Sequence, residues 1–256
     1  VSQWGYVGFF YSFFTQLTEA NNQDVDMNTV ATLASSSTEG TRVLFTENHD
    51  MASQQNHGRI PNIVNPGGNP AKPTYWALKK SLLGMGVVLT APGIPLLLQG
   101  QEMLTYATFE FPSPPPLDWS LVSTNAGVVQ AVTDMIALRT NRDGTSLGLT
   151  GDNAAIVQVI DGSAQKVAVI HRWSSETGAG QHMLVIYNMY QTKCAAFTLT
   201  NVPMDGTWKV VFNGDLQEYS SQYANCGASQ TTVTVSNGSG SVQLPEFSML
   251  VLAYQG

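Results

Sequence analysis

The sequence contains 256 residues with a mass of 27.6 kDa, a length that suits one large domain or two of medium size. Its hydrophobic content of 43% and aromatic content of 9% exclude a disordered chain, because this much apolar surface can offset the entropy lost on folding. Charged residues make up only 11% and the formal net charge is −7, so we expect neutral polar ligands rather than nucleic acid or an anionic membrane.

Residues 1–150 alternate between helical and strand patterns. The spacing of apolar residues predicts helices at 4–17, 27–34, 75–90 and from 123 or 124 to about 144, and strands at 42–46 and 94–98. Both strand runs are mainly apolar, which is typical of a parallel sheet covered on both faces. A long polar loop, 47–72, follows the first strand, and loops of this length in compact domains are usually functional. The order strand, loop, helix predicts an α/β architecture.

From about residue 150 the hydrophobic period changes to two. Short strands separated by turn residues are predicted at 156–159, 166–170, 183–187, 197–199, 208–212, 231–235 and 249–254. This pattern predicts an all-β antiparallel sandwich over 151–256, joined to a first domain, 1–150, near Asn141 to Asp152. No apolar run is long enough to span a bilayer, since glycines and prolines interrupt the longest one, Leu82 to Leu98.

Both cysteines, Cys194 and Cys226, fall in the predicted sandwich. Two cysteines cannot form a disulfide scaffold and do not supply the Cys-x-x-Cys spacing of a structural zinc site. A single disulfide and two buried thiols remain equally open. His49 and His57, in the polar loop, do not have a compact zinc spacing either, so we expect no metal site.

The most reactive side chains follow the first predicted strand. In α/β proteins the loops after the strands carry the reacting groups, and the run from Thr46 to Asp50 places a carboxylate, an imidazole and an amide together there. His49 and Asp50 could bind sugar hydroxyls through charge-assisted hydrogen bonds, and Asp50 could stabilise a developing positive charge. The alternative, equally supported by composition, is that Asn48, His49 and Asp50 only cap a loop.

Several segments, in order and at suitable spacing, give the chain a family resemblance from about Trp4 to its end. The run FTENHD from Phe45 to Asp50 resembles the motif that ends the seventh barrel strand in the α-amylase family of glycoside hydrolases and glucanotransferases. The run PGIPLLLQGQE from Pro92 to Glu102 is similar to the eighth strand of that family. The segments 51–63 and 116–119 resemble branching-enzyme-like members, and the segments 208–215 and 247–252 resemble the sandwich that follows the barrel.

The resemblance implies the last part of a (β/α)8 TIM barrel followed by a C-terminal β-sandwich. Catalysis in the family is retaining, with a nucleophilic Asp after the fourth strand, a Glu acid/base after the fifth and a stabilising Asp after the seventh. Asp50 matches the stabilising Asp, and His49, with Asn48 beside it, matches the group that hydrogen-bonds sugar hydroxyls. No residue of this sequence matches the nucleophile or the acid/base, so we expect this chain alone to be inactive.

The resemblance also implies partners. We expect an α-1,4-glucan or malto-oligosaccharide as substrate and the N-terminal half of the same enzyme as the structural partner. The chain begins at Val1 without Met or a basic leader, so we expect it to be truncated or processed. No cofactor is expected within the chain, although calcium could bind through the N-terminal part. The low charge and a disulfide, if formed, favour a secreted protein or one of an organelle lumen, although the compartment stays unknown.

Several further residues have two interpretations. Glu102 could contact substrate, but a structural role at the top of the barrel is favoured. Aromatic side chains after the second strand could stack on glucose rings, although packing under the loop is expected for at least half of them: Tyr106, Phe109, Phe111 and Trp119. His171 and His182 are interpreted as ordinary surface or turn residues. The alternative to an enzyme is a non-catalytic carbohydrate-binding or storage homologue that keeps the scaffold.

Overall fold

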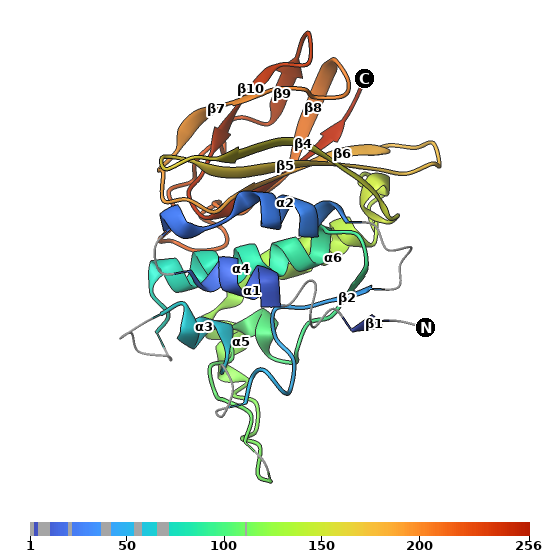
Figure 1. Ribbon diagram of the computed structural model, residues 1–256. Helices are drawn as coiled ribbons and strands as arrows, with labels where there is room; N and C mark the ends of the chain where they lie inside the picture. The colour runs from blue at the N-terminus through green and yellow to red at the C-terminus, as the bar shows by residue number, and fades with distance from the viewer. Residues whose placement is uncertain are drawn as a thin grey trace.

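The computed structural model describes residues 3–4, 11–19, 22–36, 42–53, 58–65, 72–110 and 112–256. Figure 1 shows a β-rich layer at one end, with helix α2 directly against it and helices α1, α4 and α6 beneath. Short strands and helices, with a long loop, form the opposite end of the molecule. The bounds of the helices are α1 (Tyr11–Thr18), η2 (Asn22–Asp24), α2 (Met27–Ser35), α3 (Ile60–Ile63), α4 (Tyr75–Thr90), η3 (Gln101–Met103), α5 (Ser120–Thr124), α6 (Ala126–Arg139) and η4 (Leu147–Leu149).

Three short strands form a parallel sheet in the order β1 (Gln3–Trp4), β2 (Arg42–Leu44) and β3 (Ile94–Pro95). Gly93 permits β3 to start beside β2, because its φ is +131° and a Cβ there would lie 2.8 Å from the carbonyl oxygen of Arg42. The predicted parallel pairing is therefore present. A closed eight-stranded barrel is not seen in the described residues.

Three predictions for residues 1–150 need correction. Trp4 pairs with Val43 in the sheet, so the predicted helix 4–17 was wrong at its start, and α1 begins at Tyr11. The predicted long loop 47–72 contains α3, which Pro61 favours as an early helical residue. The predicted last helix is divided at Asn125, where α5 ends and α6 begins.

The C-terminal part is an antiparallel β structure, as predicted. A six-stranded sheet has the order β4-β5-β6-β11-β8-β9, and a two-stranded sheet pairs β10 with β7. The bounds are β4 (Asn153–Asp161), β5 (Lys166–Trp173), β6 (His182–Asn188), β7 (Ala195–Leu199), β8 (Gly206–Asn213), β9 (Thr232–Val235), β10 (Gly240–Leu244) and β11 (Ser248–Tyr254). Strand β10 was missed from the sequence, since its glycine and polar residues give only a short apolar alternation.

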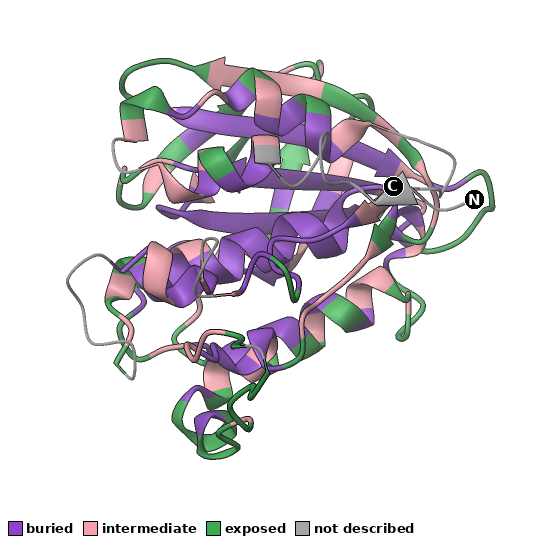
Figure 2. Ribbon diagram, turned by 60° about the horizontal axis from the view of Figure 1, so that its bottom comes forward, coloured by how far each residue is buried: buried purple, intermediate pink, exposed green. Residues whose placement is uncertain are grey.

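Both faces of the six-stranded sheet are buried. One face packs between the two sheets, with Val169, Leu184 and Leu252 in its core. The other face packs on the helices, where Ile170 and Val185 join a second core with residues of α1, α2, α4 and α6. Figure 2 shows the central strands and the adjacent helix as the most continuously buried part of the molecule. The predicted division into domains 1–150 and 151–256 stays a prediction, and this second core contains residues from both ranges.

A disulfide links Cys194, just before β7, to Cys226, in the loop between β8 and β9. The two alternatives left open for the cysteines are thus decided in favour of the bridge. Its Cα atoms lie 5.3 Å apart, within the usual range for a disulfide. Over the part of the chain with described structure, no helix has the length and apolar character needed to cross a membrane.

Candidate functional site

The segment after β2 makes a tight turn that presents two side chains to solvent. The side-chain oxygen of Asn48 accepts a hydrogen bond from the backbone N–H of Met51 at 2.8 Å, and the backbone oxygen of Asn48 accepts one from Ala52 at 2.9 Å. Asn48 is buried, whereas the side chains of His49 and Asp50 are 65% and 58% exposed. The turn therefore uses the Asn48 oxygen internally and directs the imidazole and the carboxylate outward.

His49 and Asp50 lie next to each other in space as well as in sequence. The Nε2 atom of His49 is 3.4 Å from Oδ1 of Asp50, so a protonated imidazole would pair with the carboxylate. This arrangement offers an anionic oxygen and an imidazole N–H together, a combination that suits hydroxyl-rich ligands. His57, which precedes Arg59 in the same loop, lies outside the described residues.

A buried ion pair fixes the base of the turn. Oε2 of Glu47 accepts a hydrogen bond from Nε of Arg59 at 2.7 Å, and Oε1 accepts one from the backbone N–H of Ile60 at 2.6 Å. Burial raises the pKa of the Glu47 carboxyl, while Arg59 and the Ile60 N–H oppose that increase. Arg59 also reaches the backbone oxygen of Gln99 at 3.4 Å. Glu47 is therefore a positioning residue that ties β2, α3 and the end of the β3 segment together.

The loop after β3 is tied to the same turn. Nε2 of Gln101 donates a hydrogen bond to the hydroxyl oxygen of Thr46 at 2.7 Å. The backbone N–H of Phe109 donates one to the backbone oxygen of Ala52 at 2.9 Å. Gln101 is buried, and Glu102 beside it is half-buried and contributes to the raised pKa of Glu47. Gln101 thus links the two loops by hydrogen bonds, while the structural role expected for Glu102 stays a prediction.

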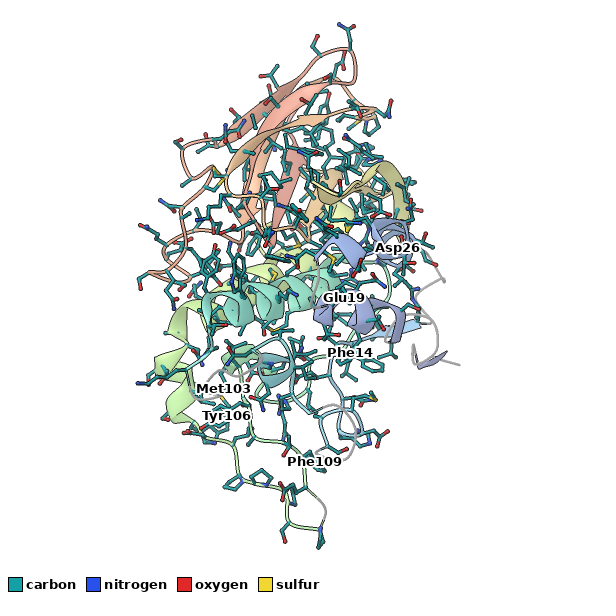
Figure 3. All side chains as sticks on the ribbon, turned by 60° about the vertical axis from the view of Figure 1, so that its left-hand side comes forward. Phe14, Glu19, Asp26, Met103, Tyr106 and Phe109 are labelled. Atoms are coloured by element: carbon teal, nitrogen blue, oxygen red, sulfur yellow. A yellow bond between two sulfur atoms is a disulfide. The ribbon has the colours of Figure 1, made fainter. Side chains whose placement is uncertain are left out.

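Aromatic side chains lie on the loop that follows β3. Figure 3 shows Met103, Tyr106 and Phe109 along this loop, at the end of the molecule opposite the β sheets. Met103 is fully buried, Phe109 is 37% exposed and Trp119, just before α5, is 69% exposed. Phe111 lies outside the described residues. The loop thus combines a packed base with exposed rings, and the backbone of Phe109 is bonded to the segment of Asp50 through Ala52.

Sequence reasoning missed the two interactions that position the turn. In the sequence, Glu47 was noted only as the carboxylate in the run from Thr46 to Asp50. Arg59 and Gln101 were noted only within the segments that resemble the α-amylase family. No local signal was available, because the burial of Glu47 depends on its pairing with Arg59, twelve positions away.

His171 and His182 are not ordinary turn residues. Their rings stack with centroids 5.3 Å apart, and Nε2 of His171 is 3.1 Å from Nδ1 of His182. The ring of Trp173 also stacks on His171, with the ring centroids 4.9 Å apart. Burial and the neighbouring imidazole lower the pKa of His171 to about 4, and burial lowers that of His182.

The described residues contain no group of three or more His, Cys, Asp or Glu side chains placed to hold a metal ion. The calcium site considered from the resemblance was assigned to preceding sequence, so it stays a prediction.

The comparisons with known proteins agree with the β architecture. Residues 159–255 match a protein family described as the C-terminal all-β domain of α-amylase. A 1,4-α-glucan branching enzyme of Novosphingobium aromaticivorans is 28% identical over 174 residues, which cover 67% of this chain and 23% of that enzyme.

Solved structures share the fold along nearly the whole chain. A pullulanase from Bacillus acidopullulyticus has a TM-score of 0.62 at 18% identity, covering 96% of this chain and 30% of that one. A pullulanase from an Anoxybacillus species, complexed with maltotetraose, has a TM-score of 0.59 at 16% identity, and the match covers 97% of this chain and 35% of that one. A Gamma-CGTase from alkalophilic Bacillus clarkii has a TM-score of 0.60 at 17% identity, and the match covers 94% of this chain and 31% of that one. The chain therefore spans about a quarter to a third of the length of these proteins.

Proposed function

Since this chain matches the C-terminal part of α-amylase-family enzymes, we propose that it belongs to a retaining enzyme that acts on α-glucans. In this proposal Asp50 stabilises the positively charged sugar of the transition state, and His49 hydrogen-bonds its hydroxyls. The observation that carries the proposal is the exposed His49–Asp50 pair at the end of β2, held out by the buried Glu47–Arg59 ion pair.

The chemistry follows from charge. As the glycosidic bond breaks, positive charge develops on the anomeric carbon and ring oxygen, and a nearby carboxylate stabilises that charge more than it stabilises the neutral substrate. The Asp50 side chain is 58% exposed, so an incoming ligand can reach its carboxylate. The buried ion pair beneath fixes the backbone, so the carboxylate needs little rearrangement when the charge appears.

A retaining reaction also needs a nucleophile and an acid/base about 5–5.5 Å apart. We propose that both come from an N-terminal part of the same enzyme, whether in this polypeptide before Val1 or as a separate chain. The fraction of its relatives that this chain spans, 23% of the branching enzyme and 30% of a pullulanase, supports this division. In this proposal residues 1–150 supply the last strands of a (β/α)8 barrel, and the chain alone is inactive.

The proposed substrate is an α-1,4-glucan or malto-oligosaccharide. The exposed rings of Phe109 and Trp119 support this proposal, because the C–H faces of glucose pack on aromatic planes. The similarity to a branching enzyme favours transfer of a glucosyl segment over hydrolysis. Product analysis on a linear glucan distinguishes the two, since transfer creates new branch points and hydrolysis releases reducing ends.

The test replaces the carboxylate alone. In the natural protein, Asp50→Asn should reduce kcat about 100- to 1,000-fold, because the amide has nearly the same shape but no charge. Asp143→Asn, in the exposed segment after α6, is the matched control and should keep wild-type kcat. Both variants should keep the wild-type melting temperature.

Wild-type turnover by the Asp50→Asn variant would refute the assigned role. A natural protein that binds malto-oligosaccharides but never turns them over would instead identify the non-catalytic binding homologue.

A further inference from the structure

A cavity of about 480 Å³ lies where the helices meet the β sheets. It shares no lining residue with the turn of Asp50 or the loop after β3. Its lining comes from the end of α1, from α3 and the start of α4, and from loops next to β6 and β11. We call it the Trp76 cavity; it is lined by Thr18, Asn22, Ile63, Val64, Asn65, Thr74, Trp76, Lys80, Gln191 and Phe247. A volume of this size falls within the range of small-molecule sites.

An exposed indole forms one wall of the Trp76 cavity. Trp76 is 40% exposed although it is the second residue of α4, and its ring is braced from two sides. Tyr75 contacts it edge-on with centroids 4.9 Å apart, and Phe247 contacts it edge-on at 5.4 Å. The indole is therefore held in place while part of it stays open to a ligand, at little further entropy cost on binding.

Apart from Lys80, the polar side chains that line the Trp76 cavity are neutral amides and hydroxyls. Nδ2 of Asn22 contacts Oε1 of Gln191 at a long 3.4 Å, which joins η2 to the loop after β6. Asn22 and Gln191 both line the cavity, and each side-chain amide carries a hydrogen-bond donor and an acceptor. None of the described residues that line the cavity carries a carboxylate.

Lys80 supplies the only cation among these lining residues, and it is already engaged. Its Nζ donates to the backbone oxygen of Glu19 at 2.8 Å and lies 5.3 Å from the centre of the Phe247 ring. Burial lowers the pKa of this lysine. The Lys80 ammonium is therefore already held by contacts within the protein.

We propose that the Trp76 cavity binds a segment of an α-glucan chain as a second site, separate from the turn of Asp50. A braced indole beside neutral donors and acceptors is the combination that a sugar requires, since the ring presents a C–H face and a rim of hydroxyls. The choice of glucan rests on the proposed function. Binding here would hold a long polymer on the protein while another part of it lies at Asp50.

The test separates this site from the active site by using long and short ligands on the natural protein. Trp76→Ala should weaken retention in an amylopectin gel about tenfold and raise KM for amylopectin, with kcat unchanged. Turnover of a short malto-oligosaccharide should stay at the wild-type level. Trp76→Phe should restore most of the retention, and Gln191→Ala should weaken it without disturbing the Trp76 contacts. Ile156→Ala, which removes an exposed apolar side chain from β4, is the matched control.

Retention of Trp76→Ala and Gln191→Ala equal to that of Ile156→Ala would overturn this inference. The proposed function would be untouched by that result as long as Asp50→Asn is inactive. Conversely, full turnover by Asp50→Asn together with weakened retention by Trp76→Ala would support the second site while refuting the role of Asp50.

Discussion

Two neighbouring carboxylates after β2 have opposite environments. Glu47 is buried, with both oxygens bonded inside the protein, whereas Asp50, three residues later, is mostly exposed. The difference follows from the turn, because Asn48 reverses the chain between them. A paired, desolvated carboxylate serves as an anchor, and a solvated one can meet a ligand.

The contribution of the buried Glu47–Arg59 ion pair can be tested by removing the arginine. Arg59→Met should lower the free energy of unfolding by about 3–5 kcal/mol, since Glu47 would be left charged, buried and unpaired. Because the folded state then favours the protonated Glu47 even more, it binds protons that the unfolded state releases. The loss should therefore be largest at pH 8 and smaller at pH 5, as measured by urea unfolding.

Glu47→Gln is the matched variant for this experiment. It keeps an oxygen for the Ile60 N–H but removes the charge, so its own stability should vary less with pH than that of Arg59→Met. A loss below about 1 kcal/mol in Arg59→Met would contradict the anchoring role.

At the residue scale, the sequence was sufficient to locate the turn but not its internal roles. His49 and Asp50 could be chosen because charged residues directly follow an apolar strand. The burial of Glu47 could not be predicted, since its partner Arg59 is twelve positions away and is brought near only by α3. The ring stack of His171 on His182 likewise depends on strand β5 being paired with β6.

At the scale of elements, long periodic segments were predicted well and short ones were not. Helix α4 and the central strands of the sandwich are close to their predicted ranges, because each buries a long apolar face. The two-residue strand β1 owes its existence to pairing with β2, which no local pattern near Trp4 reveals. Strand β10 pairs with the distant β7, and its own residues carry little strand preference.

The disulfide next to the two-stranded sheet of β7 and β10 should contribute to the stability of the protein. Cys194 precedes β7, and Cys226 precedes β9, with a sequence separation of 32 residues. Replacing both cysteines by alanine should lower the free energy of unfolding by roughly 2–4 kcal/mol, because the unfolded chain regains the freedom that the closed loop removes. Urea unfolding of the oxidised protein and the double variant measures this difference.

Addition of a reducing agent should shift the oxidised protein toward the double variant and leave the variant unchanged. Equal unfolding midpoints for the two proteins would contradict the contribution of the bridge.

At the scale of the whole molecule, the helices and the β sheets are joined by buried charges. Lys79 of α4 pairs with Asp215, in the loop after β8, and both side chains are almost fully buried. Oδ2 of Asp215 also accepts a hydrogen bond from the backbone N–H of Cys226 at 2.8 Å. Nζ of Lys79 lies 4.5 Å from the centre of the Tyr223 ring. Burial lowers the pKa of Lys79, and Asp215 opposes that decrease.

Breaking this pair should weaken the contact between the two parts of the molecule. Lys79→Met should cost about 3–5 kcal/mol of unfolding free energy, since Asp215 keeps a buried charge without its partner. The double variant Lys79→Met with Asp215→Asn should recover at least 1 kcal/mol, because no buried charge then remains. A double-mutant cycle by urea unfolding measures this coupling, and strictly additive losses would contradict it.

Arg172 has a consequence for how the central sheet finds its alignment. Strands β5 and β6 are apolar on both faces. A shift of their pairing register by one residue would therefore replace apolar contacts with other apolar contacts. The fully buried guanidinium of Arg172 donates hydrogen bonds to the backbone oxygens of Thr90, Leu149, Gly151 and Asn153. After a slip it would point between the sheets, far from those oxygens. The hydrogen bonds of Arg172 thus fix the register of β5, which the apolar pattern of the strand alone does not specify.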